Sequence, residues 1–317
     1  DLALVRADFQ GAAWQFLIGL LQTAFAPRDI QEWADRWETP PTLEELDAAF
    51  APFRDAFELG GDGARFMQDL DPLADKPPGP IASLLIEAPG AQTLKLNADH
   101  FVKRDMADRI CPDCAAMALF TMQINAPSGG KGYRTGIRGG GPLTTLALPH
   151  DPAATLWQKL WLNVLDREEY SFPEPEASGE TFPWLTATRE SDRPGSEILP
   201  DDMRPLQVYW AMPRRFRLAF EHAPCRCDLC GRESETSVTG VRAKNYGNNY
   251  AGPWVHPLTP YRLDPKKPAE PPLSIKGQPG GIGYRHWETL VLEDRGNRGQ
   301  LPARVVRDYS ARKAPIL

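Results

Sequence analysis

Apolar side chains in the first 57 residues follow a helical period. Across residues 2–26 they recur every three or four positions, which is typical of a helix with one face in a protein core. A short helix is expected over 30–37. Thr42 and Glu45 form a capping box, the reciprocal backbone and side-chain pairing that opens a helix, so a third helix is predicted over 42–57. These three helices are expected to pack together as a helical cap.

Farther along the chain, the apolar pattern predicts shorter elements. Helices are expected over 113–125 and 152–165, with His150 and Asp151 ending one segment and capping the second helix. The stretch 170–201 is rich in proline and acidic residues and is expected to be a surface loop. Alternating apolar and polar residues predict short strands over 93–97, 206–220, 238–242, 254–261, 287–292 and 304–309.

Proline limits the length of these elements. With 32 prolines among 317 residues, the chain is expected to have long irregular connections. The predicted fold class is therefore α+β: an irregular, loop-rich mixed globular domain with a helical cap and short strands. An apolar content of 42% suffices for one large core or two smaller ones.

Composition and charge narrow the classes of function. The mean hydropathy is −0.43 and no run of 18 apolar residues occurs, which excludes a predicted membrane span. A net charge of −6 and a pI near 5.5 argue against a free-standing, nonspecific DNA-binding protein, which is normally basic. Basic residues nevertheless gather in two segments: 101–138 has six Lys/Arg against three Asp, and 212–250 has seven Lys/Arg against four acids.

Both basic segments contain a pair of cysteines with metal-ligand spacing. These are Cys111-Pro-Asp-Cys114 and Cys227-Asp-Leu-Cys230, while Cys225 is the spare. The two-residue spacer lets both sulfurs of a pair reach one ion, and four thiolates complete the tetrahedral shell of a structural zinc. Free buried thiols and a catalytic metal with an open position are the alternatives. Cysteines in this arrangement fit a reducing compartment, so a cytoplasmic location is expected.

A glycine-rich segment follows the first cysteine pair. Residues 128–142 hold seven glycines in fifteen positions, including Gly130 and Gly132 on either side of Lys131. The segment is not a Walker A loop, because no Gly-Lys-Ser/Thr opens a helix there. It is either a flexible linker or a bare backbone that, with Lys131 and Arg134, approaches a nucleic-acid groove.

The second cysteine pair is followed by a basic, amide-rich and aromatic segment, 241–250, which includes Arg242 and Lys244. Arg, Lys and Asn side chains contact bases and phosphates, although a solvated loop explains this composition equally well. If the two cysteine pairs share a metal, this segment and the glycine-rich one are expected to be neighbours. The five histidines are scattered and no Ser/His/Asp set or carboxylate pair stands out, so no catalytic set is predicted.

The order of these pieces resembles one family, the large subunit CasA of the type I-E CRISPR surveillance complex Cascade. The resemblance covers nearly the whole chain. The family's first strands and its C-terminal four-helix bundle are expected to be missing, so 1–317 is interpreted as a CasA-like N-terminal globular domain. Besides the cysteine pairs, the resemblance rests on Phe66-Met-Gln68, Asn125-Ala-Pro127, Gly136-Ile-Arg-Gly-Gly-Gly-Pro-Leu-Thr-Thr145, Leu160-Trp-Leu-Asn163, Gly231-Arg-Glu-Ser234 and Trp254-Val-His-Pro257.

The resemblance implies a non-catalytic subunit that recognises the protospacer-adjacent motif (PAM) of duplex DNA through the minor groove and promotes R-loop formation. Lys103 stands where the family has asparagine, and Lys131 interrupts an otherwise all-glycine loop. Three family features correspond here to the tip Phe101, Val102 and Lys103, the glycine loop Gly130, Lys131 and Gly132, and a lysine finger at Lys244 with Arg242 as the alternative.

The resemblance also implies partners. These are the crRNA-containing backbone and small subunits of Cascade, double-stranded target DNA and the helicase-nuclease effector of antiviral defence, in a prokaryotic cytoplasm. A rival hypothesis is a zinc-ribbon enzyme that binds a phosphorylated substrate at the glycine loop, which requires a strand–loop–helix order. An interaction scaffold without nucleic-acid contact is the third alternative.

Overall fold

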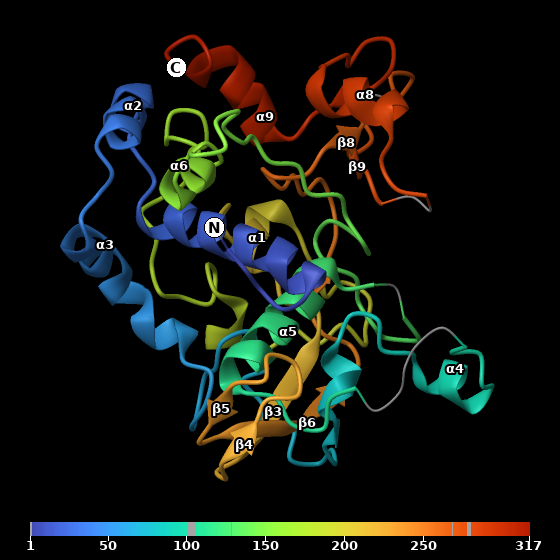
Figure 1. Cartoon of the computed structure of the whole chain (residues 1–317). Coiled ribbons are helices and arrows are strands. Elements are labelled where there is room, and N and C mark those ends of the chain that lie inside the picture. Colours follow the sequence, from blue (N-terminus) through green and yellow to red (C-terminus); the bar gives the residue numbers. More distant parts are fainter. Residues whose placement is uncertain (1, 101–105, 128, 268, 278–279) are drawn as a thin grey trace.

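Figure 1 shows the computed structural model of the chain, which describes residues 2–100, 106–127, 129–267, 269–277 and 280–317. The α-helices are α1 (Ala7–Ala24), α2 (Ile30–Glu38), α3 (Leu43–Phe50), α4 (Ala91–Lys95), α5 (Pro112–Asn125), α6 (Leu156–Trp161), α7 (Gln207–Trp210), α8 (Trp287–Val291) and α9 (Arg304–Asp308). Shorter turns are the 3-10 helices η1 (Ala51–Phe57), η2 (Ile81–Leu84), η3 (Pro183–Leu185), η4 (Pro200–Asp202) and η5 (Tyr284–His286) and the π-helix η6 (Tyr309–Lys313).

The strands are short and form small sheets, so the predicted α+β class is confirmed. The largest sheet has the order β1-β6-β3, with antiparallel neighbours. The strands are β1 (Gly79–Pro80), β2 (Glu197–Ile198), β3 (Arg215–Glu221), β4 (Cys225–Arg226), β5 (Glu233–Ser234), β6 (Ser237–Lys244), β7 (Asn249–Tyr250), β8 (Tyr261–Arg262), β9 (Leu273–Ser274) and β10 (Gln300–Leu301).

Helices α1 and α5 lie against each other at the centre of the molecule (Figure 1). Helix α5 is buried on most of its circumference, which explains its continuous apolar sequence. Aromatic rings from α1, η1, α5, η3, α7 and two connecting segments meet beside this pair, with centroids between 5.2 and 6.2 Å apart. Such ring contacts stabilise the core beyond the effect of the apolar area they bury. The rings belong to Phe16, Phe57, Phe66, Phe120, Phe182, Trp184 and Trp210.

The N-terminal helices begin and end close to their predicted bounds. Leu4 and Val5 precede α1 and are exposed, so that helix is shorter than predicted. The capping box of Thr42 and Glu45 is present at the start of α3. The predicted third helix then tightens into the 3-10 turn η1, which carries Pro52 in its first turn. Among the described residues, no helix is both long and apolar enough to cross a membrane.

Several strand predictions are wrong. Residues 93–97 fall in α4 and the turn after it, and residues 287–292 and 304–309 lie largely in α8 and α9. These segments bond their backbones locally, for example from the Arg307 N–H to the Ala303 carbonyl at 3.1 Å. Over only five or six residues, an alternating pattern fits a short helix as well as a strand, and the sequence does not show whether a neighbouring strand is available. In the predicted strand 254–261, only the last residue, Tyr261, belongs to a strand, which is β8.

Other predictions need narrower bounds. The strand expected over 206–220 divides into α7 and β3. The helix expected over 152–165 is limited to α6, because its capping residue is Thr155 and not Asp151, which makes a turn with Ala153 instead. The predicted surface loop 170–201 includes Phe182 and Trp184, both fully buried in the aromatic core.

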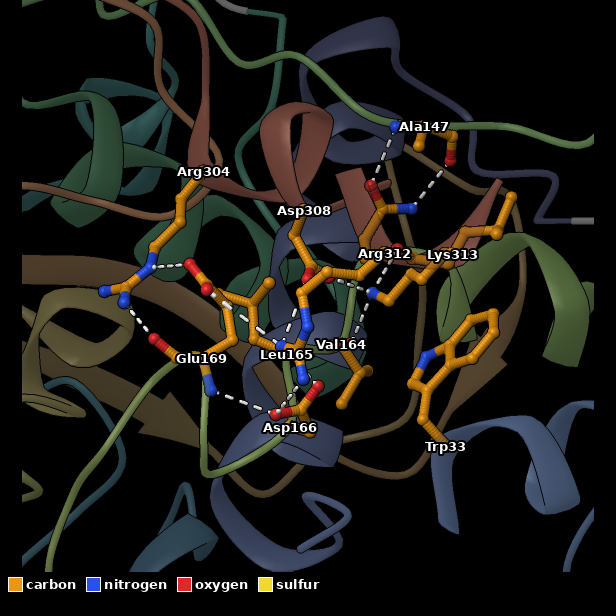
Figure 2. A network of polar contacts seen from close by, with 12 residues as sticks. Trp33, Ala147, Val164, Leu165, Asp166, Glu169, Arg304, Asp308, Arg312 and Lys313 are labelled. Carbon is orange, nitrogen blue, oxygen red and sulfur yellow. Dashed lines mark hydrogen bonds and ion pairs between the residues drawn. The ribbon is translucent and has the colours of Figure 1, made fainter. Parts of the chain in front are cut away.

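A buried lysine fixes the C-terminal end of the described chain (Figure 2). The Lys313 ammonium donates to the carbonyls of Leu162 and Val164 at 3.0 and 2.9 Å, and it pairs with the Asp308 carboxylate at 2.7 Å. It also lies 4.8 Å from the centroid of the Trp33 ring, a cation–π contact. The side chains of Lys313 and Asp308 are both 0% exposed, so the lysine charge depends on Asp308 for compensation, while Asp308 also contacts Arg312 at 3.4 Å.

Replacing Lys313 is expected to destabilise the fold strongly. Lys313→Met keeps the volume but leaves the Asp308 charge with a weaker partner and two buried carbonyls without their donor. The free energy of unfolding, measured by urea denaturation, is expected to fall by about 3 kcal/mol. Arg298→Met is the control, since it removes an exposed pair with Glu288. Equal unfolding midpoints for the two variants would contradict the role assigned to Lys313.

Candidate metal centre and nucleic-acid interface

The two cysteine pairs lie together, although more than 110 residues separate them in sequence. The sulfurs of Cys111, Cys114, Cys227 and Cys230 all lie within 4.8 Å of one another, and the Cys111 and Cys230 sulfurs are 3.7 Å apart. Sulfurs at about 2.3 Å from a tetrahedral zinc are about 3.8 Å from each other, whereas a disulfide needs about 2.05 Å. The spacing therefore fits four ligands around one ion. The spare, Cys225, lies outside this cluster.

Local backbone structure presents each pair. Cys111 is the N-cap of α5 and Cys114 stands in its first turn, where the positive end of the helix dipole favours thiolates. The second pair sits at the tip of the β4–β5 hairpin, in a knuckle closed by a 2.9 Å bond from the Gly231 N–H to the Cys227 carbonyl. Gly231 has φ +72°, which favours glycine there.

Burial and hydrogen bonding shift the pKa values of Cys111, Cys114 and Cys230 in different directions. Burial raises the pKa of Cys111 to about 11 and raises that of Cys114 as well. Burial also opposes ionisation of Cys230, but hydrogen bonds from Arg232 outweigh it and lower the pKa of this thiol to about 6. A bound cation ionises its thiol ligands. The donor set and its spacing thus fit a structural metal with a closed shell of four sulfurs.

Protein contacts join the two pairs independently of any metal. Ile110 and Val238 exchange two backbone hydrogen bonds of 3.1 and 2.8 Å. The Asp228 carboxylate accepts from the backbone N–H groups of Asp108 and Arg109, both at 2.8 Å. The start of α5 and the start of β6 are consequently held side by side.

The glycine loop, defined as residues 129–132, begins beyond the C-terminal end of α5. Arg214 fastens its flanks: the guanidinium donates to the carbonyls of Pro127 and Arg134 and lies 4.6 Å from the centroid of the exposed Tyr133 ring. The linker interpretation is therefore wrong for these flanks. Arg134 donates to the Ser191 hydroxyl at 2.7 Å, so this arginine, expected to reach a groove, is engaged within the protein.

The glycine loop and the Lys244 turn (residues 244–247) are neighbours, as the sequence predicts. The Tyr246 N–H donates to the Gly132 carbonyl at 2.8 Å, and the Asn245 side chain donates to the Lys131 carbonyl at 2.8 Å. Gly132 has φ +79°, and a Cβ there would lie 3.0 Å from both Asn245 and Tyr246. This approach requires glycine at position 132.

The predicted DNA-contacting residues differ in what their side chains do. Lys131 is exposed, and the described structure shows no ion pair for it. Arg242 donates to the Lys76 carbonyl at 3.1 Å. The Lys244 ammonium lies 3.6 Å from the Glu190 carboxylate. Of the two finger candidates, Lys244 is the one whose cation is not committed to a backbone carbonyl. Phe101, Val102 and Lys103 lie outside the described residues.

Sequence reasoning missed the residues that organise this region. Ser191 receives Arg134 from the glycine loop flank, donates its hydroxyl to the Gly247 carbonyl at 2.6 Å, and donates its N–H to the Tyr246 carbonyl at 3.0 Å. Its neighbour Glu190 contacts Lys244. These contacts span more than 50 residues of sequence, and neither residue belongs to a motif, so no local signal identifies them.

The rival phosphate-cradle hypothesis requires a strand before the loop and a helix after it. The glycine loop instead follows the C-terminal end of α5, where helix carbonyls carry partial negative charge and disfavour a phosphate. The required order is absent from residues 106–127 and 129–155.

A family model described as CRISPR-associated protein Cse1 matches residues 1–315. The chain belongs to the Cse1 family. The solved structures similar to it include Thermus thermophilus CasA (Cse1), with a TM-score of 0.62, 19% identity, and coverage of 97% of this chain and 58% of that chain. Thermobifida fusca Cse1 gives a TM-score of 0.62 and 19% identity over 95% of this chain and 57% of that chain.

A chain of a CRISPR RNA-guided surveillance complex has the same fold, with a TM-score of 0.60 and 14% identity over 96% of this chain and 60% of that chain. At these identities the likeness concerns the Cse1 fold. This chain thus spans less than two thirds of the length of each of these Cse1-fold structures.

The cysteine cluster makes a testable prediction. Purified protein is expected to hold about one equivalent of metal per chain by elemental analysis, and zinc is the ion that four thiolates favour. Cys227→Ser should lose most of this metal and unfold at a lower temperature, because one ligand of a closed shell is gone. Cys225→Ser, in the same hairpin but outside the cluster, should keep both. A full metal equivalent in Cys227→Ser would contradict the assignment.

Proposed function

We propose that this Cse1-family chain is a non-catalytic DNA-recognition subunit of a CRISPR RNA-guided complex. It reads the PAM of duplex target DNA through the minor groove, promotes R-loop formation and helps recruit a helicase-nuclease. Its other partners are crRNA-containing subunits, in keeping with the fold it shares with a chain of a surveillance complex. The observation that carries this proposal is the pairing of the glycine loop with the Lys244 turn.

Groove geometry supports this assignment. The minor groove is narrow and presents few distinguishing groups, so a bare backbone and one or two cations read it permissively. Gly130 and Gly132 keep the loop thin, Lys131 extends from its exposed tip, and Lys244 stands on the neighbouring turn. We assign base-edge or phosphate contacts to Lys131 and Lys244, with Arg242 behind them. Phe101, Val102 and Lys103 are proposed as a further contact.

The acidic net charge is compatible with this role. A subunit held in place by an assembly needs only a local contact to DNA, and guide pairing supplies most of the sequence specificity. The cysteine cluster, with zinc as its proposed metal, serves structure only.

Removing the finger cation should weaken motif-dependent binding. In a surveillance complex reconstituted with this protein, Lys244→Ala is expected to lower affinity for PAM-bearing duplex about tenfold, the usual cost of one base or phosphate contact. Lys267→Ala is the charge-matched control, since Lys267 pairs with Glu270 in another part of the chain. Electrophoretic mobility shifts measure both. Undiminished binding by Lys244→Ala combined with Arg242→Ala would remove the finger assignment.

The close packing of Gly132 against the Lys244 turn should affect DNA binding independently of the Lys244 charge. Gly132→Ala places a methyl group 3.0 Å from Asn245 and Tyr246 in a backbone conformation that alanine resists, so the Lys244 turn must shift. We expect weaker binding to PAM-bearing duplex, with the unfolding free energy lowered by only about 1 kcal/mol. Gly296→Ala, which meets nothing within 4 Å, is the control. Unchanged DNA binding in Gly132→Ala would mean that the loop contact does not position the reader.

A further inference from the structure

Four cations share one face of the β3–β6 pair, and they oppose each other in register. Arg215 pairs with Lys244 across the strands, and Arg217 pairs with Arg242. Residues paired in this way project to the same face of a sheet. Like charges directly opposite each other are destabilising, so the fold needs acidic partners at this face.

The two acids that contact Arg215 most closely have different freedom. Asp69 is 1% exposed, its carboxylate binds the Arg215 Nε, and its backbone N–H donates to the Phe216 carbonyl at 2.9 Å. Glu190 instead belongs to no helix or strand and its side chain is 45% exposed. Asp69 is therefore a fixed internal partner, whereas Glu190 can rotate into solvent.

Among the described residues, Glu190 is the acid that contacts both the buried arginine and the proposed finger. Its Oε1 atom lies 2.6 Å from the Arg215 Nη1 and 3.6 Å from the Lys244 Nζ. The first contact is an ion pair without hydrogen-bond alignment, since the buried Nη1 has no hydrogen-bond partner in the described structure. Arg215 is only 2% exposed. The Arg215 Nη1 is thus a buried, charged donor without a hydrogen-bond partner, and the exposed Glu190 carboxylate covers it beside the paired loops.

We propose that the space between Arg215 and Lys244 is a binding position for a phosphodiester group of DNA, and that the Glu190 carboxylate occupies it in the free protein. This inference rests on the proposed function. A phosphate oxygen and a carboxylate oxygen make the same charge-assisted contacts with guanidinium and ammonium groups. When DNA binds, Glu190 turns outward, the phosphate oxygen aligns with Nη1, and Asp69 keeps the inner side of Arg215 neutralised.

Glu190 is also well placed to transmit this exchange. Its neighbour Ser191 bonds both the glycine loop flank, through Arg134, and the Lys244 turn, through Tyr246 and Gly247. Lys244 exchanges the Glu190 carboxylate for the DNA phosphate, so binding of the DNA backbone and engagement of the finger lysine occur together. Asp71 is a further acid at this site: its carboxylate is 47% exposed and lies 3.5 Å from the Arg215 Nη2. Asp75, by contrast, pairs with Lys76 at 3.2 Å.

The test removes the charge of Glu190 and keeps its shape. We expect Glu190→Gln to bind duplex DNA about threefold to tenfold more tightly than the wild type, because the DNA phosphate no longer displaces a carboxylate. Fluorescence anisotropy on the purified protein and on the reconstituted complex measures this. Glu180→Gln is the matched control: it changes the net charge equally, but Glu180 pairs with Arg204 and contacts neither Arg215 nor Lys244 in the described structure.

A second measurement tests the contact between Glu190 and Lys244 in the absence of DNA. The Lys244 amine should be methylated faster in Glu190→Gln than in the wild type, with Lys131 as the internal reference, by mass spectrometry of the free protein. Equal DNA affinity for Glu190→Gln and the wild type, when the wild type binds DNA, would overturn the phosphate position and leave the proposed function standing. Absence of DNA binding by the wild-type complex would overturn both.

Discussion

The two backbone hydrogen bonds between Ile110 and Val238 are the constraint on which the proposed interface depends. They set the start of α5 beside the start of β6. From that junction α5 extends 14 residues, about 21 Å, and β6 extends 8 residues, about 26 Å. Two elements of similar length that begin together can also end together, and the hydrogen bonds from Tyr246 to Gly132 and from Asn245 to Lys131 show that they do. The glycine loop follows one and the Lys244 turn follows the other, so these meet at the far end.

This arrangement changes the role expected for the cysteine cluster. Because each loop follows a cysteine pair in the sequence, the order indicates that the cluster itself holds the two loops together. In the structure, the cluster lies at the starts of α5 and β6, away from the loops. Near the loops the positioning is done by hydrogen bonds: Gln123 in the last turn of α5 holds the backbone N–H and carbonyl of Arg214, just before β3. A metal therefore acts on the loops only through the stability of the junction. Cysteines and backbone hydrogen bonds thus hold the starts of α5 and β6 together, whereas side-chain hydrogen bonds position the segments near the loops.

Local sequence signals predicted the features that local physics decides. The Thr42 capping box, the buried helix after Cys114 and the convergence of the cysteine pairs each rest on a few neighbouring residues or on ligand chemistry, and each is present. Predictions failed where a short apolar alternation had no way to indicate whether a partner strand existed, as in residues 287–292.

Long-range pairs were beyond sequence reasoning for a related reason. Lys313 looks like an ordinary charged residue near the end of a helix, and only the carbonyls of Leu162 and Val164 make its burial possible. Glu190 lies in a proline- and acid-rich stretch that reads as solvated loop. Its importance comes from facing Arg215 and Lys244, and neither distance nor charge balance is visible in a single sequence.

Charge balance also explains how an acidic chain presents a surface to DNA. Cations brought together by strand register cannot remain uncompensated in the free protein, so a phosphate-binding face in such a sheet starts with carboxylates on it. If all of these carboxylates were buried like Asp69, a phosphate could not displace them, and if none were present the strands would repel. Around Arg215, the buried Asp69 together with the exposed Glu190 and Asp71 satisfies both demands. Glu190, the exposed acid that also contacts Lys244, then sets how readily the surface exchanges an internal carboxylate for a DNA phosphate.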